Sequence, residues 1–335
     1  MRPIPLNFQT MYADLLQSIG LADVAHGSVS VRKIKGRDYL YVTTKDGAKR
    51  NQRSLGPASD PGAQAQAEEI RRAARDAKGL RTTVSVLKKA YIPGPTLALG
   101  RVLEAVANAG LFKQGAVLVG TSAYQTYPCL VGAYLPSSAL MTNDADLLVS
   151  SFVAAEEPQD LEAILKRADP TFKARMSRDD RLPKVFVADN KFQVDVLTTF
   201  GRGRKSPVLI DGLRCSAEAL KFMEYLAEDC VEAVALYGTG VLVSVPPPMR
   251  YAIHKLLIAQ ERRSNPVKRS KDLKQAKDLI DVFLETDSSA FDEALEEARG
   301  RGPKWRKNIN ASLREVQRDV RQGNLALAHR RKPRK

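Results

Sequence analysis

Cysteine and long apolar runs are both scarce in this sequence. Its three cysteines, Cys129, Cys215 and Cys230, are scattered and lack the spacing of metal ligands. No apolar run reaches the roughly 18 residues that a helix needs to cross a bilayer, so we expect no contact with a membrane. The segment 1–4 has neither the basic nor the apolar region of a signal peptide. A disulfide framework and secretion are therefore not expected, and the reducing cytoplasm is the expected compartment.

Negative charge is also in short supply, with 38 Asp and Glu against 53 Lys and Arg and a net charge of +15. The segment 301–335 contains twelve basic and two acidic residues, so two-thirds of the excess lies in the last tenth of the chain. Dense basic clusters attract polyanions through counterion release without recognising sequence. We therefore expect contact with nucleic acid; a solubilising surface is the alternative. A second basic cluster comprises Arg32, Lys33, Lys35, Arg37, Lys45, Lys49, Arg50 and Arg53.

Periodicity and turn residues divide the chain into segments. Strand-like alternation runs through 27–55, with turns at Gly36 and at Asp46-Gly47. Helical and strand patterns alternate over 96–245, which predicts an α/β (α+β) sheet domain, and helical spacing follows. No internal repeat is visible. The expected domains are a small β-rich N-terminal module (1–60), a helical linker (61–95), a sheet domain (96–248), a helical C-terminal domain (249–298) and a basic tail (299–335).

An Asp-x-Asp pair, Asp144 and Asp146, is the first candidate for chemistry. On a strand, residues two apart project from the same face, so the two carboxylates would lie side by side. Ionised carboxylates at that distance repel each other, which raises a pKa or requires a cation. Mg²⁺ suits such a pair because it prefers oxygen ligands and commonly takes one or two carboxylates plus substrate phosphates. Alone, the pair is weak support for a metal site, and a solvated loop is the alternative.

A turn of small residues, Gly120-Thr121-Ser122, follows a buried strand at 116–119 and precedes an expected helix. Backbone N–H groups at such a turn suit a phosphate. The alternative is an ordinary strand-to-helix turn in which Thr121 or Ser122 caps the helix.

A third acid, Asp195, stands inside the apolar run 192–197. A carboxylate in such a run is costly unless it is paired or binds a cation. An exposed strand position is the alternative. Beside the Asp-x-Asp pair, Asp195 would complete a two-metal site for phosphoryl transfer.

Together, Gly120-Thr121, Asp144-x-Asp146 and Asp195 resemble the motifs of the DNA polymerase β-like nucleotidyltransferase superfamily. The resemblance implies a mixed-sheet nucleotidyltransferase core at 96–248 as the catalytic domain. It implies that Gly120, Thr121 and Ser122 bind the phosphates of an NTP. The acids would be catalytic ligands of Mg²⁺ or Mn²⁺, and Asp195 would help to activate the acceptor. The turn reads Gly-Thr rather than the commoner Gly-Ser, a mild departure because both hydroxyls can serve a phosphate.

The motifs look particularly like a bacterial nucleotidyltransferase-like group related to AbiE-type toxins. The helical segment 246–273 strengthens this comparison. By the resemblance, Lys255 contacts the triphosphate and Asp272 takes part in catalysis; a surface helix with solvated charges is the alternative. His254 is interpreted as a packed helix residue rather than an acid or base.

The expected activity is transfer of a nucleoside monophosphate from an NTP, with release of pyrophosphate, to an RNA end or a protein side chain. The basic clusters favour RNA, with tRNA as the hypothetical acceptor, and an antitoxin partner would accompany a toxin or phage-defence role. A non-catalytic nucleic-acid-binding protein, or a regulatory protein on the same fold, is the alternative. Loss of activity on Asp144→Ala would separate an enzyme from either alternative.

Overall fold

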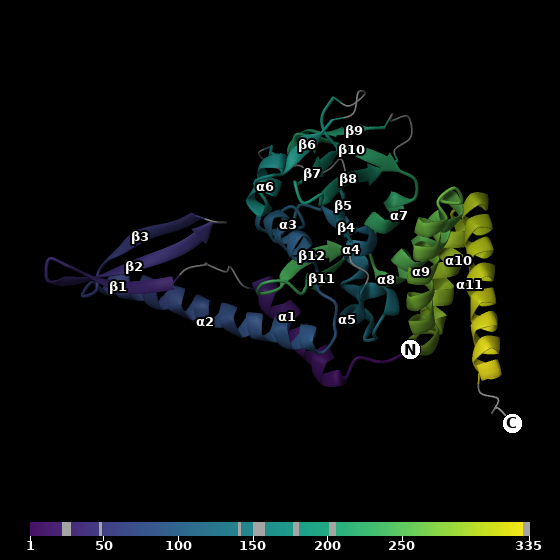
Figure 1. Ribbon diagram of the computed structural model, residues 1–335, viewed down its shortest axis with the longest axis horizontal. Coiled ribbons are helices and arrows are strands. Elements are labelled where there is room, and N and C mark those ends of the chain that lie inside the picture. The colour runs from purple at the N-terminus through teal and green to yellow at the C-terminus, as the bar shows by residue number, and fades with distance from the viewer. Residues whose placement is uncertain are drawn as a thin grey trace.

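A long helix separates a small β-sheet from the main body of the molecule (Figure 1). The computed structural model describes residues 1–21, 28–46, 49–139, 142–149, 158–176, 181–200 and 206–330. The strands are β1 (Ser28–Ile34), β2 (Arg37–Asp46), β3 (Lys49–Pro57), β4 (Val117–Val119), β5 (Asp144–Leu148), β6 (Lys173–Arg175), β7 (Val185–Val187), β8 (Gln193–Thr199), β9 (Val208–Ile210), β10 (Cys215–Leu220), β11 (Val231–Ala235) and β12 (Val241–Val245). The α-helices are α1 (Leu6–Leu21), α2 (Pro61–Lys89), α3 (Leu97–Asn108), α4 (Gly120–Tyr124), α5 (Tyr127–Val131), α6 (Leu161–Ala168), α7 (Met223–Ala227), α8 (Pro248–Glu261), α9 (Pro266–Thr286), α10 (Ser288–Gly300) and α11 (Pro303–Arg330).

The N-terminal sheet lies on the first half of α2, and we call these elements, residues 28–89, the arm. Strands β1, β2 and β3 pair antiparallel in sequence order. The helix begins after Asp60, whose side chain accepts from the backbone of Gly62 and Ala63 and so caps it. Leu40 of β2 and Ala67 of α2 are buried together at the interface. One face of the sheet is therefore covered by α2.

A helix that the sequence analysis did not anticipate, α1, lies within the predicted N-terminal module. It packs with the second half of α2 and with the hairpin of β11 and β12, in a cluster that includes Tyr12, Leu15 and Leu87. The Tyr12 hydroxyl accepts from the backbone N–H of Val234 at 2.8 Å. Residues 1–21 therefore belong structurally with the main body, and the β-rich part of the predicted module is the segment 28–57.

The main body is built around a mixed seven-stranded sheet in the order β4-β5-β8-β10-β9, with β7 pairing to β8 and β6 to β7. Strands β5, β8 and β10 are parallel, whereas β4 and β9 run antiparallel to their neighbours. Strands β4, β5, β7 and β8 lie at the positions that the sequence pattern predicted. Leu118, Leu147, Val194 and Val196 of this sheet are buried in the largest apolar cluster, together with residues of α3 and α6. The predicted mixed α/β fold is confirmed.

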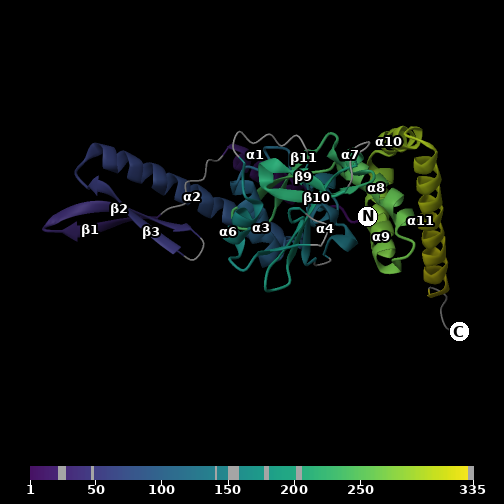
Figure 2. The same ribbon diagram turned by 90° about the horizontal axis from the view of Figure 1, so that it is seen from above.

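Four helices, α8 to α11, form the C-terminal region, which confirms the predicted helical character (Figure 1). The first half of α11 packs on α8 and buries Trp305, Ile309 and Val316. The predicted basic tail therefore begins as a docked helix. Figure 2 shows α11 and the arm at opposite ends of the molecule. In the described part of the chain, no helix combines the length and apolarity needed to cross a bilayer.

Candidate active site on the β5–β8 face

The three acids that carried the sequence argument lie on two neighbouring strands. Asp144 opens β5, and Asp146 stands two residues further on, so both project from one face. In the parallel pairing of β5 with β8, Asp146 is the register partner of Asp195, and Asp144 is the partner of Gln193. Paired strands lie about 4.8 Å apart, so Asp146 and Asp195 are immediate neighbours on this face. The fold thus brings together acids that are distant in sequence.

The turn at Gly120 lies directly against Asp146. Gly120 has a φ of +67°, in the left-handed region that favours glycine. A Cβ atom at this position would overlap Oδ2 of Asp146, so a larger residue would displace the carboxylate. The Ser122 hydroxyl donates to the backbone carbonyl of Asp144 at 2.9 Å, which ties the turn to the start of β5. Helix α4 has only five residues, so its dipole is small. The turn would therefore bind an anion mainly through its backbone N–H groups.

Burial and mutual repulsion disfavour the charged forms of the acids. The pKa of Asp146 is raised from 3.8 to about 6, first by burial and then by the charges of Asp144 and Asp195. Burial also raises the pKa of Asp195, a hydrogen bond from Gln193 lowers it, and the charge of Asp144 raises it. An added cation would relieve both the burial cost and the repulsion.

Two of the acids are held by neighbouring side chains. The Gln193 amide donates to both carboxylate oxygens of Asp195 at 2.8 Å. The Thr142 hydroxyl donates to Oδ1 of Asp144. Among the described residues, no group of three Asp, Glu, His or Cys side chains is arranged to hold a metal ion. The metal-binding role of the three acids therefore stays a prediction, although all three share one face of the sheet.

A buried ion-pair network faces these acids from helices α8 and α9. Nζ of Lys255 lies 2.7 Å from Oδ1 of Asp272, and Nη1 of Arg262 lies 2.7 Å from Oδ2. Burial lowers the pKa of Lys255, while the charges of Asp272 and Asp146 raise it. Lys255 is thus close enough to interact electrostatically with both carboxylates. Both Asp272 oxygens are engaged by cations, so Asp272 orients two positive charges toward the acidic face.

Tyr251 links the same helices to the small-residue turn. Its hydroxyl donates to the backbone carbonyl of Gly120 at 2.8 Å and lies 3.0 Å from Oε1 of Gln275. Nζ of Lys255 lies 5.1 Å from the centre of the Tyr251 ring. Tyr251 and Lys255 are four residues apart on α8 and so share one helix face. Tyr251 was not among the predicted site residues, although its spacing from Lys255 was a usable signal.

Further positive charge comes from residues that the sequence argument also missed. The charges of Lys268, in the first turn of α9, and Arg175, at the end of β6, both lower the pKa of Asp195 against the larger effect of burial. Neither residue belongs to a motif, and only the folded chain brings them near β8. The acidic face is therefore bordered by cations from three separate elements.

His254, which precedes Lys255, is buried, and neither ring nitrogen has a hydrogen-bond partner among the described residues. Burial lowers its pKa well below the usual range, and the charges of Lys255 and Arg262 lower it further. The imidazole is therefore neutral near pH 7 and packed in the core.

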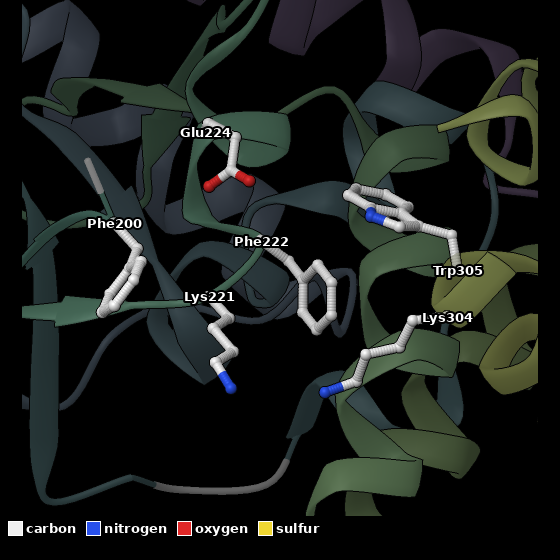
Figure 3. Close-up of a pocket in the computed structure, with 6 residues that line it drawn as sticks. All are labelled: Phe200, Lys221, Phe222, Glu224, Lys304 and Trp305. Atoms are coloured by element: carbon white, nitrogen blue, oxygen red, sulfur yellow. The ribbon is translucent and has the colours of Figure 1, made fainter. Parts of the chain in front are cut away.

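A separate pocket of about 250 Å³ opens where β8 and β10 end and α11 begins. In Figure 3, the amines of Lys221 and Lys304 point to one side of the opening, and the Glu224 carboxylate lies on the other. Lys304 is also paired with Glu261 at 2.7 Å. None of Asp144, Asp146 and Asp195 lines this pocket, so it is separate from the acidic face of β5 and β8. Its lining residues are Phe200, Lys221, Phe222, Glu224, Lys304 and Trp305.

A comparison with the models of known protein families identifies a nucleotidyltransferase core. Residues 98–300 match the model of a family described as Nucleotidyltransferase. This match covers more than half of the chain, so the protein belongs to that family, and nucleotidyl transfer from an NTP is its general activity.

A solved structure, that of an antigenic nucleotidyltransferase-like protein from Paracoccidioides brasiliensis, is similar over 65% of this chain and 95% of that one. The two share 14% sequence identity with a TM-score of 0.33, a likeness too weak to support an argument. No curated protein matches the chain.

Proposed function

We propose that the protein transfers a nucleoside monophosphate from an NTP to the hydroxyl of an RNA end, releases pyrophosphate, and uses Mg²⁺ or Mn²⁺. The observation that carries the proposal is the register pairing of Asp146 with Asp195 beside the Gly120 turn. The cations Lys255 and Arg262 face this acidic site and suit a triphosphate.

The donor set fits a divalent cation shared with the substrate. Mg²⁺ usually takes one or two carboxylates together with substrate phosphates and water, so three protein ligands are not required. Asp144 and Asp146 would hold the ion, because they share a strand face and burial raises the pKa of Asp146. Asp195 would join them once its carboxylate turns from Gln193. The ion would supply neutralisation of the charge on the phosphates.

The remaining groups have separate tasks in this reaction. The backbone N–H groups of the turn at Gly120, Thr121 and Ser122 bind the phosphates, and Lys255 and Arg262 neutralise their charge. The acceptor oxygen attacks the α-phosphorus and forms a new P–O bond, while the bond from that phosphorus to the oxygen of the leaving pyrophosphate breaks.

Asp195 accepts the proton of the attacking hydroxyl, a task favoured by a raised pKa. The role assigned to Asp272 changes from direct catalysis to positioning, because both its oxygens already bind cations.

RNA is the proposed acceptor because the chain is strongly basic, and tRNA is the first RNA to test. Transfer to a protein side chain would use the same site with a different acceptor hydroxyl. The resemblance to AbiE-type enzymes further suggests a toxin or phage-defence role in the cytoplasm, restrained by an antitoxin. Toxicity on expression that Asp146→Asn removes would support this role, and harmless expression of the active enzyme would contradict it.

The direct test incubates the full chain with each α-labelled NTP, Mg²⁺ or Mn²⁺, and total cellular RNA and protein. We expect label in RNA, with loss of at least about a hundredfold in rate for Asp146→Asn. Asp189→Asn is a matched control, because it removes the same charge from an exposed turn. Label in protein would overturn the RNA acceptor, and no label in either fraction would overturn the activity.

A further inference from the structure

In the part of the chain that the structure describes, the outer face of the arm's sheet is open, whereas α2 covers its inner face. Figures 1 and 2 both show β1 to β3 at the end of α2 that lies away from the main body. The sheet packs on α2 near Ala63 and Ala67, whereas the body packs on α2 near Val84 and Leu87. Ala67 and Val84 are seventeen residues apart on α2, which corresponds to roughly 26 Å of helix.

Strand register identifies the side chains on the open face. Leu40 and Val42 of β2 are buried against α2, so the alternate residues Tyr39 and Tyr41 point outward. Tyr39 pairs with Arg32 of β1, and residues paired across strands project from the same face. By the same rule Arg37, two residues before Tyr39, also faces outward. The open face thus carries two tyrosines flanked by two arginines.

The charge of this sheet is unbalanced. Within 28–43 and 51–57, five basic side chains are exposed against one acidic side chain, Asp38. In the part of the chain that the structure describes, none of the five is within ion-pairing distance of a carboxylate. The guanidinium of Arg32 lies over the ring of Tyr41 at 5.4 Å, which holds a cation beside an aromatic surface. The five basic residues are Arg32, Lys33, Lys35, Arg37 and Arg53.

We propose that the open face of the arm binds a single-stranded stretch of nucleic acid. Arg32 and Arg37 contact phosphates, and Tyr39 and Tyr41 offer rings for stacking on bases. Unpaired cations attract phosphates, and aromatic side chains on a sheet stack with bases that are not already paired. A duplex hides the faces of its bases, so the tyrosines favour a single strand. This inference goes beyond the proposed transfer activity and does not depend on it.

The test measures binding of fluorescent single-stranded RNA, single-stranded DNA and duplex to the full chain without NTP. Titrations between about 50 and 200 mM salt give the slope of log affinity against log salt concentration, which reports the number of phosphate contacts. Arg32→Gln with Arg37→Gln should lower affinity and flatten the slope by about 1.4, at ~0.7 for each single-strand phosphate contact. Arg101→Gln with Lys113→Gln removes the same charge from exposed sites on the body and should leave the slope unchanged.

Tyr39→Leu tests the stacking separately from the charge. We expect a loss of about tenfold in single-strand affinity with an unchanged salt slope, because stacking does not release counterions. An unchanged slope for the double arginine variant would overturn the proposal. So would tighter binding of duplex than of either single strand together with no effect of Tyr39→Leu.

Discussion

Replacing Asp146 with asparagine should stabilise the metal-free protein while removing its activity. The carboxylate lies against Gly120 and next to Asp195, where its charged form is disfavoured. Asparagine has nearly the same shape and carries no charge. The Asp146 carboxylate, which the reaction requires, would therefore destabilise the folded protein until a cation binds.

The magnitude follows from the shift in the pKa of Asp146 from 3.8 to about 6. Each pKa unit corresponds to about 1.4 kcal/mol, and solvent near the half-buried side chain reduces the effect, so we expect about 1 to 3 kcal/mol. The sign follows from the raised folded pKa. Protonated Asp146 contributes fully to the stability of the folded protein below the unfolded pKa of 3.8. This contribution is lost as pH rises through the folded pKa of about 6. Asp146→Asn should therefore unfold at higher urea concentration than wild type near pH 8, with little difference near pH 4.

The assay is urea unfolding in a chelating buffer, followed by tryptophan fluorescence at both pH values. Asp189→Asn, on an exposed turn, should show no such pH-dependent gain. Mg²⁺ with NTP should stabilise wild type and not Asp146→Asn, because ligands that bind only the folded state add to its stability. A variant that is as stable as wild type or less stable near pH 8 would refute the reasoning about burial and repulsion.

Three further substitutions test the surroundings of Asp146. Gly120→Ala should displace the carboxylate and reduce nucleotide transfer at least about tenfold, and near-normal transfer would show that the turn tolerates a side chain. Tyr251→Phe removes the hydroxyl that donates to the Gly120 carbonyl, and it should lower the free energy of unfolding by about 1 to 2 kcal/mol. Urea unfolding measures this change. An unchanged free energy would show that water replaces the hydroxyl. Lys255→Met leaves the buried Asp272 with one cation and should cost about 3 to 5 kcal/mol. Adding Asp272→Asn should recover part of this loss, and strict additivity of the two changes would argue against a coupled pair.

Much of the acidic face could be predicted because the relevant signals are local. Asp144 and Asp146 share a strand face through simple alternation, and Asp195 stands out because an acid inside an apolar run is costly. The turn at Gly120 could also be predicted, because small residues follow a short apolar run that is typical of a buried strand. What the sequence could not supply was the register that pairs Asp146 with Asp195, since register depends on how two distant strands meet.

The missed features depend on contacts between distant segments. Helix α1 is stabilised by packing on α2 and on the β11–β12 hairpin, including the bond from Val234 to Tyr12, and its own sequence gave no strong signal. Lys268 and Arg175 reach the site from α9 and β6, with no motif to connect them to Asp195. Trp305 and Ile309 lie in the first half of the predicted basic tail, yet they pack into the core because α11 continues the helical region.

The C-terminal helices are therefore expected to organise the catalytic site as well as to complete the core. Lys255 belongs to α8 and Asp272 to α9, and each helix alone would leave a buried charge without its partner. Tyr251 connects this helix pair to the Gly120 turn, whose left-handed backbone allows Asp146 to approach. A shift between α8 and α9 would consequently move the cations and the turn together relative to the acids. Substitutions at the α8–α9 contact should for this reason impair transfer, and they should also lower the free energy of unfolding, because both helices share one apolar cluster with the β-sheet.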